Sequence, residues 1–162
     1  MLKSIRQDGG FIVYETRAIC RYLATKHPEA GLIPTELTEN AIFEQAAAEE
    51  TCNFDPSAMA IGVEVWKQSH GYPSDQSIID AQLPVLDKKL DGYEAILWKQ
   101  RYVAGDKFTL ADLFHLPFAQ LVASSGSDIM TRKPNVARWY NELVARPSWL
   151  AYGGGVKTTT AY

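Results

Sequence analysis

The residues with the clearest capacity for chemistry stand together near the start of the chain, in Tyr14-Glu15-Thr16-Arg17. An apolar, strand-like segment precedes them and a helical pattern follows, so Glu15 and Thr16 lie at a strand-to-helix junction. The start of a helix has unpaired backbone N–H groups and the positive end of a dipole, which suit a carboxylate. Thr16 adds a hydroxyl donor there, and Glu15 can hold an ammonium group. The pair is therefore suited to binding the two charged groups of an amino acid.

Other reactive side chains are better explained by structure than by chemistry. Tyr14 ends a strand, where packing accounts for it, and Arg17 suits a solvated or ion-paired position on a helix. Cys20 lies in mid-helix, away from a helix start that would lower a thiol pKa from about 8.5, and the same holds for Cys52. His115 has no Cys, His or acidic partner at ligand spacing. No catalytic residue and no metal ligand is predicted.

The composition of the 162 residues is that of a globular chain, with 46% hydrophobic and 22% charged residues and a net charge of −3. Its basic residues are scattered, so neither nucleic acid nor an acidic membrane surface is an expected partner. No apolar run approaches the roughly 20 residues of a spanning helix, and no signal-peptide core is present. Two cysteines are too few for a disulfide scaffold. We therefore expect a cytoplasmic protein.

Two elements must position the junction. Residues 4–7 and 11–14 flank Asp8-Gly9-Gly10, a tight-turn signal, and are predicted to form a hairpin. A helix follows over residues 16–26, ended by His27-Pro28.

Every later periodic segment is helical. A long helix is predicted over 38–66, capped by Thr38 or Asn40 and bent at Asp55-Pro56. Residues 75–99 carry an apolar stripe at helical spacing, interrupted by Pro84. Thr109 and Asp112 have the spacing of a capping box, and a last helix covers 134–145. The stripe consists of Ile79, Leu83, Leu86, Leu90, Tyr93 and Leu97.

With these elements in order, four segments resemble the glutathione transferase family, in particular its phi class and fungal relatives. The strand–E–[S/T]–R–A–I–x–x–Y–L pattern at the junction is similar to the segment that holds the γ-glutamyl end of glutathione in members of this family. The other three are Tyr102 to Leu113, Leu113-Phe114-His115-Leu116-Pro117, and Pro134-Asn135-Val136-Ala137-Arg138-Trp139-Tyr140 through to Arg146-Pro147-Ser148-Trp149.

The resemblance implies a mainly α fold, with the family's C-terminal helical bundle preceded by a truncated thioredoxin-like remnant of one hairpin and one helix. Residues 1–27 are then the remnant of the glutathione-binding domain, 28–37 a linker and 38–162 the all-helical domain. The family places its thiol-activating residue in the part that this remnant lacks, so none is assigned here.

The resemblance also implies a function. Glu15 and Thr16 would bind glutathione, which serves as co-substrate without a further cofactor, and Phe54 and Met59 would face the pocket of a small apolar electrophile. The expected reaction is conjugation of the glutathione thiol to that electrophile by a homodimer, if the missing N-terminal part is present. Two alternatives stay open: a non-catalytic short homologue that binds apolar or peptide ligands, and a dimerising module.

Overall fold

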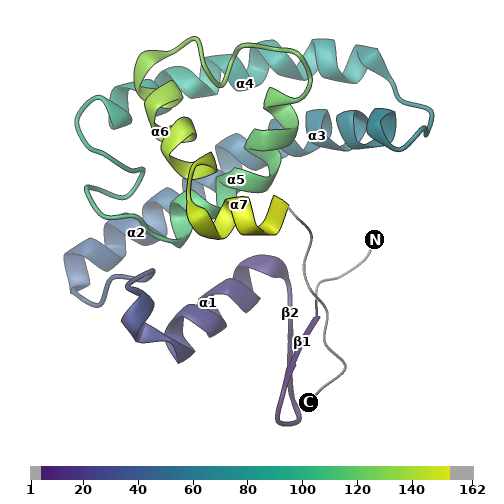
Figure 1. The fold of residues 1–162 in the computed structure, drawn as a ribbon. Helices are drawn as coiled ribbons and strands as arrows, with labels where there is room; N and C mark the ends of the chain where they lie inside the picture. Colours follow the sequence, from purple (N-terminus) through teal and green to yellow (C-terminus); the bar gives the residue numbers. More distant parts are fainter. Residues whose placement is uncertain (1–4, 154–162) are drawn as a thin grey trace.

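The computed structural model describes residues 5–153, which form a small N-terminal unit and a larger helical bundle (Figure 1). The small unit contains β1 (Ile5–Asp8), β2 (Phe11–Tyr14) and α1 (Thr16–Lys26), and a short 3-10 turn, η1 (Pro28–Ala30), leads out of it. The bundle contains α2 (Leu37–Glu49), the π-helical turn η2 (Glu50–Phe54), α3 (Asp55–Ser69), α4 (Gln76–Leu97), α5 (Leu110–Ala123), α6 (Pro134–Val144) and α7 (Pro147–Gly153).

This arrangement confirms the predicted mainly α fold with one hairpin and one helix before the bundle. The domain boundaries at residues 27 and 38 stay predictions. Ser4, the first residue of the predicted first strand, lies outside the described residues. None of the described helices is both long enough and apolar enough to span a bilayer.

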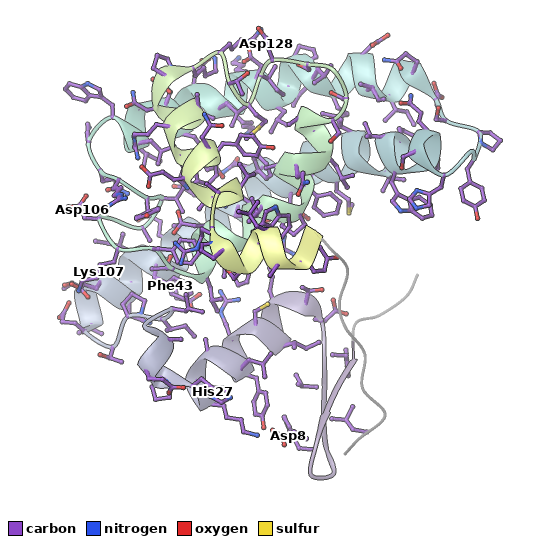
Figure 2. All side chains as sticks on the ribbon, viewed as in Figure 1. Asp8, His27, Phe43, Asp106, Lys107 and Asp128 are labelled. Carbon is purple, nitrogen blue, oxygen red and sulfur yellow. The ribbon has the colours of Figure 1, made fainter. Side chains whose placement is uncertain are left out.

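A two-residue turn closes the hairpin. Gly9 and Gly10 form it with φ angles of 54° and 94°, a conformation that glycine adopts readily because it has no Cβ. Next to the turn, Asp8 accepts a hydrogen bond of 2.9 Å from the hydroxyl of Tyr22 and forms an ion pair with Lys26 (Figure 2). These contacts hold the hairpin against the C-terminal half of α1.

The predicted cap of the long helix is wrong. The N-cap of α2 is Glu36, whose carboxylate accepts hydrogen bonds from the backbone N–H groups of Thr38 and Glu39 at 2.9 and 3.0 Å. Asn40, one of the two predicted caps, donates from its side chain to the carbonyl of Pro34 instead. Statistical preference favours Thr and Asn over Glu as a cap, but a carboxylate suits the positive end of the helix dipole.

A π-helical turn over Glu50–Phe54 immediately precedes Asp55-Pro56, the position of the predicted bend. The Asp55 N–H donates to the carbonyl of Glu50, five residues back, which is the hydrogen bond that defines this turn. Pro56 is the second residue of α3, and because η2 runs directly into α3, its missing N–H leaves a carbonyl of the π-helical turn without a helical donor. Single π-helical turns often mark functional positions.

The predicted stripe on 75–99 faces the core. Of its six members all but Leu83 are buried, and Leu83 is partly buried. Pro84 lies within α4 on its exposed side, so the helix continues past it, with solvent available to the carbonyl that lost its donor. Facing residues of the other helices and of the loop between α5 and α6 complete the core, among them the fully buried Phe43, Phe54, Ile61, Leu116, Met130, Trp139 and Leu143.

The capping box at the start of α5 is confirmed, and it does more than cap. The buried carboxylate of Asp112 accepts from the backbone N–H of Thr109 at 3.0 Å and from the N–H of Val103 at 3.1 Å. It also accepts from the indole Nε1 of Trp139 at 2.9 Å. One side chain therefore joins the start of α5, the preceding loop and α6.

α4 and α6 cap each other. The Glu94 carboxylate of α4 accepts from the backbone N–H groups of Asn135 and Val136 at the start of α6, at 2.9 and 3.0 Å. In return, Arg138 of α6 donates to the carbonyl of Leu97 at the end of α4, at 3.0 Å. The N–H groups at the start of α6 and the carbonyl groups at the end of α4 have no partners within their own helices, and a side chain of the other helix supplies the missing acceptor or donor.

Candidate functional site

Glu15 connects β2 to α1 with φ 73° and ψ 120°, and among residues 5–153 it is the one non-glycine residue with positive φ. A backbone held in such a region costs about 1–3 kcal/mol and is found most often at ligand-binding and active sites. Glu15 and Thr16 are both exposed, so burial of their side chains does not explain the strain. The junction holds a glutamate at the surface in a conformation that glycine would adopt more easily.

The first turn of α1 offers backbone donors to an anion. Glu15 is the N-cap, and its side chain makes no capping hydrogen bond. The first bond of the helix runs from the N–H of Ile19 to the carbonyl of Glu15 at 2.9 Å, so the N–H groups of Arg17 and Ala18 have no acceptor within the helix. These donors and the dipole favour a carboxylate, while the Glu15 carboxylate favours a cation beside it.

Arg17 is held within the protein rather than presented to a ligand, as the sequence predicts. Its guanidinium donates to both carboxylate oxygens of Glu50, at 2.8 and 2.7 Å, and lies 3.1 Å from a carboxylate oxygen of Asp55. The hydrogen bond to Glu50 raises the already high pKa of Arg17. Since Glu50 is fully buried, this ion pair anchors the first turn of α1 to the bundle.

The π-helical turn explains how two carboxylates five residues apart reach one guanidinium. In a regular α-helix, Glu50 and Asp55 would point about 140° apart around the axis. The wider π-helical turn brings positions i and i+5 onto the same side. Glu50 and Asp55 are the functional neighbours that the sequence reasoning missed. Their pattern does not differ from that of acidic residues on a solvated helix face.

The two residues predicted to line a second-substrate pocket lie in different environments. Phe54 has no exposed surface, and its ring packs against those of His115 and Tyr93, with centroids 4.8 and 6.2 Å away. Met59, on α3, is 42% exposed. Of the two, only Met59 presents surface to a ligand.

The remaining candidate groups keep their structural roles. The ring of His115 is fully buried and bridges the carbonyl of Ala111 at Nδ1 and the hydroxyl of Tyr93 at Nε2, at 2.7 and 3.0 Å. Burial raises the pKa of the Cys20 thiol, the opposite of activation. Tyr14 is exposed at the end of β2. Among the described residues, no group of three or more His, Cys, Asp or Glu side chains could hold a metal ion.

Comparison with known proteins gives a consistent result. The family model "Glutathione S-transferase, C-terminal domain" matches residues 54–147. The chain is 39% identical over 140 residues to glutathione S-transferase PM239X14 of Arabidopsis thaliana, covering 84% of this chain and 64% of that protein. It is 38% identical over 153 residues to glutathione S-transferase hmp2 of Hypomyces subiculosus, covering 90% of this chain and 72% of that protein.

Among solved structures, the fold matches glutathione S-transferase-I bound with the ligand lactoylglutathione, with a TM-score of 0.83 and 32% sequence identity. That match covers 91% of this chain and 72% of the other. The resemblance predicted from the sequence, to the phi class of the family and its fungal relatives, is thereby confirmed. The chain spans 64% of the length of the Arabidopsis relative and 72% of the fungal one.

Proposed function

Because this chain belongs to the glutathione S-transferase family, we propose that its strand-to-helix junction binds the γ-glutamyl end of glutathione. That end carries a free α-carboxylate and a free α-ammonium group on one carbon. The carboxylate accepts from the N–H groups that open α1 and from the Thr16 hydroxyl, and the ammonium donates to Glu15. The observation that carries the proposal is the strained, exposed Glu15, which is the N-cap of α1 but makes no capping hydrogen bond with its side chain.

The ion pairs of Arg17 support this role by fixing the first turn of α1. A carboxylate site made of backbone donors depends on their direction, and that direction follows the helix axis. Glu50 and Asp55 hold the axis at the position of Arg17, one residue after Thr16. Both act as positioning residues, because neither is placed to contact glutathione itself.

The reaction that we propose is conjugation: the thiol S–H bond breaks and its proton passes to solvent, the sulfur forms a bond to an electrophilic carbon, and the leaving group of that carbon departs with its bonding electron pair. The junction contributes by holding the γ-glutamyl end, which makes the encounter of thiol and electrophile effectively intramolecular. Met59 supplies an apolar surface for the electrophile. No residue of this chain is assigned to activation of the thiol.

A cytosolic homodimer completes the proposal. Cys20 and Cys52 are both free thiols, which suits a reducing compartment. Exposed apolar side chains on α2 and α4, such as Ile42 and Val85, offer surface for a second copy. Sedimentation velocity of the purified protein would test the dimer, with a monomer at micromolar concentration as the contrary result.

Calorimetric titration with glutathione tests the binding site. We expect Glu15→Gln to weaken binding tenfold or more, because a neutral amide replaces the partner of the ammonium. Thr16→Val should weaken it several-fold. Glu29→Gln is the matched control, since Glu29 is an exposed glutamate on η1, and it should bind as the unaltered protein does. Equal affinity in the Glu15 and Glu29 variants would refute the proposed site.

Two further measurements separate the enzyme from the non-catalytic binder. Conjugation of glutathione to 1-chloro-2,4-dinitrobenzene by this chain would support the enzyme, whereas glutathione binding without conjugation would support the binder. The intact mass of the natural protein should be compared with the 18.0 kDa of this chain. A product heavier by several thousand daltons would place a further segment, and with it a candidate activating residue, in the natural protein.

A further inference from the structure

One side of α1 packs against the bundle. Arg17, Cys20, Arg21 and Ala24 follow one another at steps of three, one and three residues, which places them on the same side of the helix. Ala24 is buried and Cys20 packs against the core, so this side faces the other helices. In Figure 1 it is the side toward α5. Cys20 and Ala24 contribute small apolar contacts, whereas the two arginines, one helical turn apart, contribute directed ones.

Arg21 makes an ion pair and two ring contacts with the bundle. Its guanidinium donates to both carboxylate oxygens of Glu44 on α2, at 2.9 and 3.4 Å. It also lies over the rings of Phe43 and Phe114, with Cζ 5.7 and 5.3 Å from their centroids. Phe43 and Phe114 are both buried. A guanidinium within about 6 Å of an aromatic centroid is attracted to the face of the ring, and the attraction is stronger where water is excluded.

The ring of Phe114, on α5, is shared by the two arginines. Arg17 lies over it as well, with Cζ 5.9 Å from the centroid. Two like charges four residues apart on a helix repel each other. The negative face of the aromatic ring offsets part of that repulsion, and the carboxylates that pair with each guanidinium offset more of it. Phe114 therefore joins both of the charged side chains that anchor α1 to one position on α5.

The direction of a helix axis is fixed by two points rather than one. The ion pairs of Arg17 hold the first turn of α1, and Arg21 lies about 6 Å further along the axis. The backbone N–H groups of a helix point along this axis, so a binding site made of them depends on its direction. Arg17 and Ala18 carry such N–H groups at the start of α1. A tilt of α1 would turn them away from a carboxylate held beside Glu15 and Thr16.

We propose that Phe114 is a positioning residue for glutathione: its ring holds Arg17 and Arg21 and thereby aims the N–H groups of the first turn of α1 at the γ-glutamyl carboxylate. The role toward glutathione rests on the proposed function, whereas the orientation of α1 by the ring does not. Phe114 belongs to the segment Leu113-Phe114-His115-Leu116-Pro117, in which the sequence indicates a family resemblance but no part in binding.

Three replacements at position 114 separate the effect of the ring from that of its volume. Phe114→Leu removes the ring and keeps an apolar side chain, and Phe114→Tyr keeps the ring. Pentafluorophenylalanine at this position keeps the shape of the ring but reverses the charge of its face. In calorimetric titration with glutathione, we expect Phe114→Leu and the fluorinated ring to weaken binding by roughly fivefold or more. Phe114→Tyr should bind glutathione as the unaltered protein does.

Unchanged glutathione affinity in Phe114→Leu would overturn the proposal. Unchanged affinity with the fluorinated ring would also overturn it, because the ring would then act by packing alone. Since the fluorinated ring fills the same space as phenylalanine, this second result does not depend on whether Phe114→Leu folds.

Phe118→Leu is the matched control. Phe118 lies one turn after Phe114 on α5 and is partly buried against the core, but among residues 5–153 no guanidinium lies over its ring. Its replacement should lower the melting temperature of the bundle and leave the glutathione affinity unchanged. Equal losses of affinity in Phe114→Leu and Phe118→Leu would overturn the proposal, because general destabilisation would then explain both.

Residual dipolar couplings of the ligand-free protein measure the orientation of α1 directly. In the unaltered protein, Phe114→Tyr and Phe118→Leu, the N–H couplings of residues 17–26 should fit the present orientation of α1 in the alignment frame of the bundle, and in Phe114→Leu they should not. An equally good fit in Phe114→Leu would overturn the proposal. This readout needs no glutathione. If the unaltered protein binds none, the proposed function fails, while the couplings still decide whether Phe114 orients α1.

Discussion

The guanidinium of Arg17 forms two hydrogen bonds with the carboxylate of Glu50 across 33 residues of sequence. The two side chains differ in exposure, since Glu50 is fully buried and Arg17 is 33% exposed. The charge of Glu50 therefore depends on Arg17 for compensation, and the start of α1 depends on Glu50 for its position. One ion pair serves both the stability of the bundle and the geometry of the proposed glutathione site.

Arg17→Met should destabilise the protein strongly. Removing one partner of a buried pair costs about 3–5 kcal/mol, and the partial exposure of Arg17 lowers our expectation to about 2–3 kcal/mol. The double variant Arg17→Met/Glu50→Gln should recover part of that loss, because the fully buried Glu50 charge is no longer unpaired, although Asp55 still lacks its cation. Urea unfolding of the single and double variants measures both effects. A double variant no more stable than Arg17→Met would contradict the assigned pairing.

Glu15→Gly should separate stability from binding. Glycine adopts the φ of 73° without strain, which removes about 1–3 kcal/mol of cost, while its greater freedom in the unfolded chain returns about 1 kcal/mol. We expect equal or higher stability, by up to about 2 kcal/mol, together with a loss of glutathione affinity of tenfold or more. Thermal unfolding and calorimetric titration of the same preparation provide the two readouts. A less stable variant would mean that the glutamate serves the fold.

Local signals in the sequence predict much of this structure. The stripe on α4 is built from steps of three and four residues, each about one helical turn, and the Thr109–Asp112 box spans a single turn. Both are found as predicted. The hairpin turn is equally local. Glu15 and Thr16 can be identified as candidates because the strand-to-helix junction is also a local signal. The positive φ of Glu15 cannot be predicted from the sequence, because glutamate has no preference for that conformation.

Contacts between distant segments could not be predicted. Glu94 caps α6 from 41 residues away along the chain. Glu50 and Arg17 are 33 residues apart in sequence, and they meet only because α1 packs against the bundle. The sequence likewise indicates a bend at Pro56 but gives no sign of the π-helical turn before it. Tyr72 stacks on Trp66 at the end of α3 but lies in the loop that follows, so helical periodicity alone does not connect the two residues.

Asp112→Ala should be among the most destabilising single substitutions. It leaves three buried donors, on Thr109, Val103 and Trp139, without their acceptor, and each such group costs about 1–3 kcal/mol. We expect a loss of at least about 3 kcal/mol in urea unfolding. Asp128→Ala, at an aspartate whose side chain is 71% exposed, is the control and should change stability by less than about 0.5 kcal/mol. Comparable losses in the two variants would refute the role of Asp112.

His115 should make the protein sensitive to mild acid. Burial lowers the pKa of its ring from the ordinary value of 6.5 to about 3. Between these two pH values the ring stays neutral in the folded protein and is protonated in the unfolded chain. As pH falls below 6.5 the unfolded state binds more protons, and stability decreases by up to about 1.4 kcal/mol per pH unit until the folded ring also titrates. Between pH 7.5 and 5 the expected loss from this one group is about 2 kcal/mol.

His115→Gln should flatten this dependence, even though losing the hydrogen bonds to Ala111 and Tyr93 lowers stability at every pH. The readout is the slope of unfolding free energy against pH, measured by urea titration from pH 7.5 to 5, where most carboxylates stay ionised in both states. The unaltered protein, titrated in parallel, is the reference for this slope. If His115→Gln keeps the full slope, the acid sensitivity comes from another group, and the buried ring would have to accept a proton more readily than its surroundings indicate.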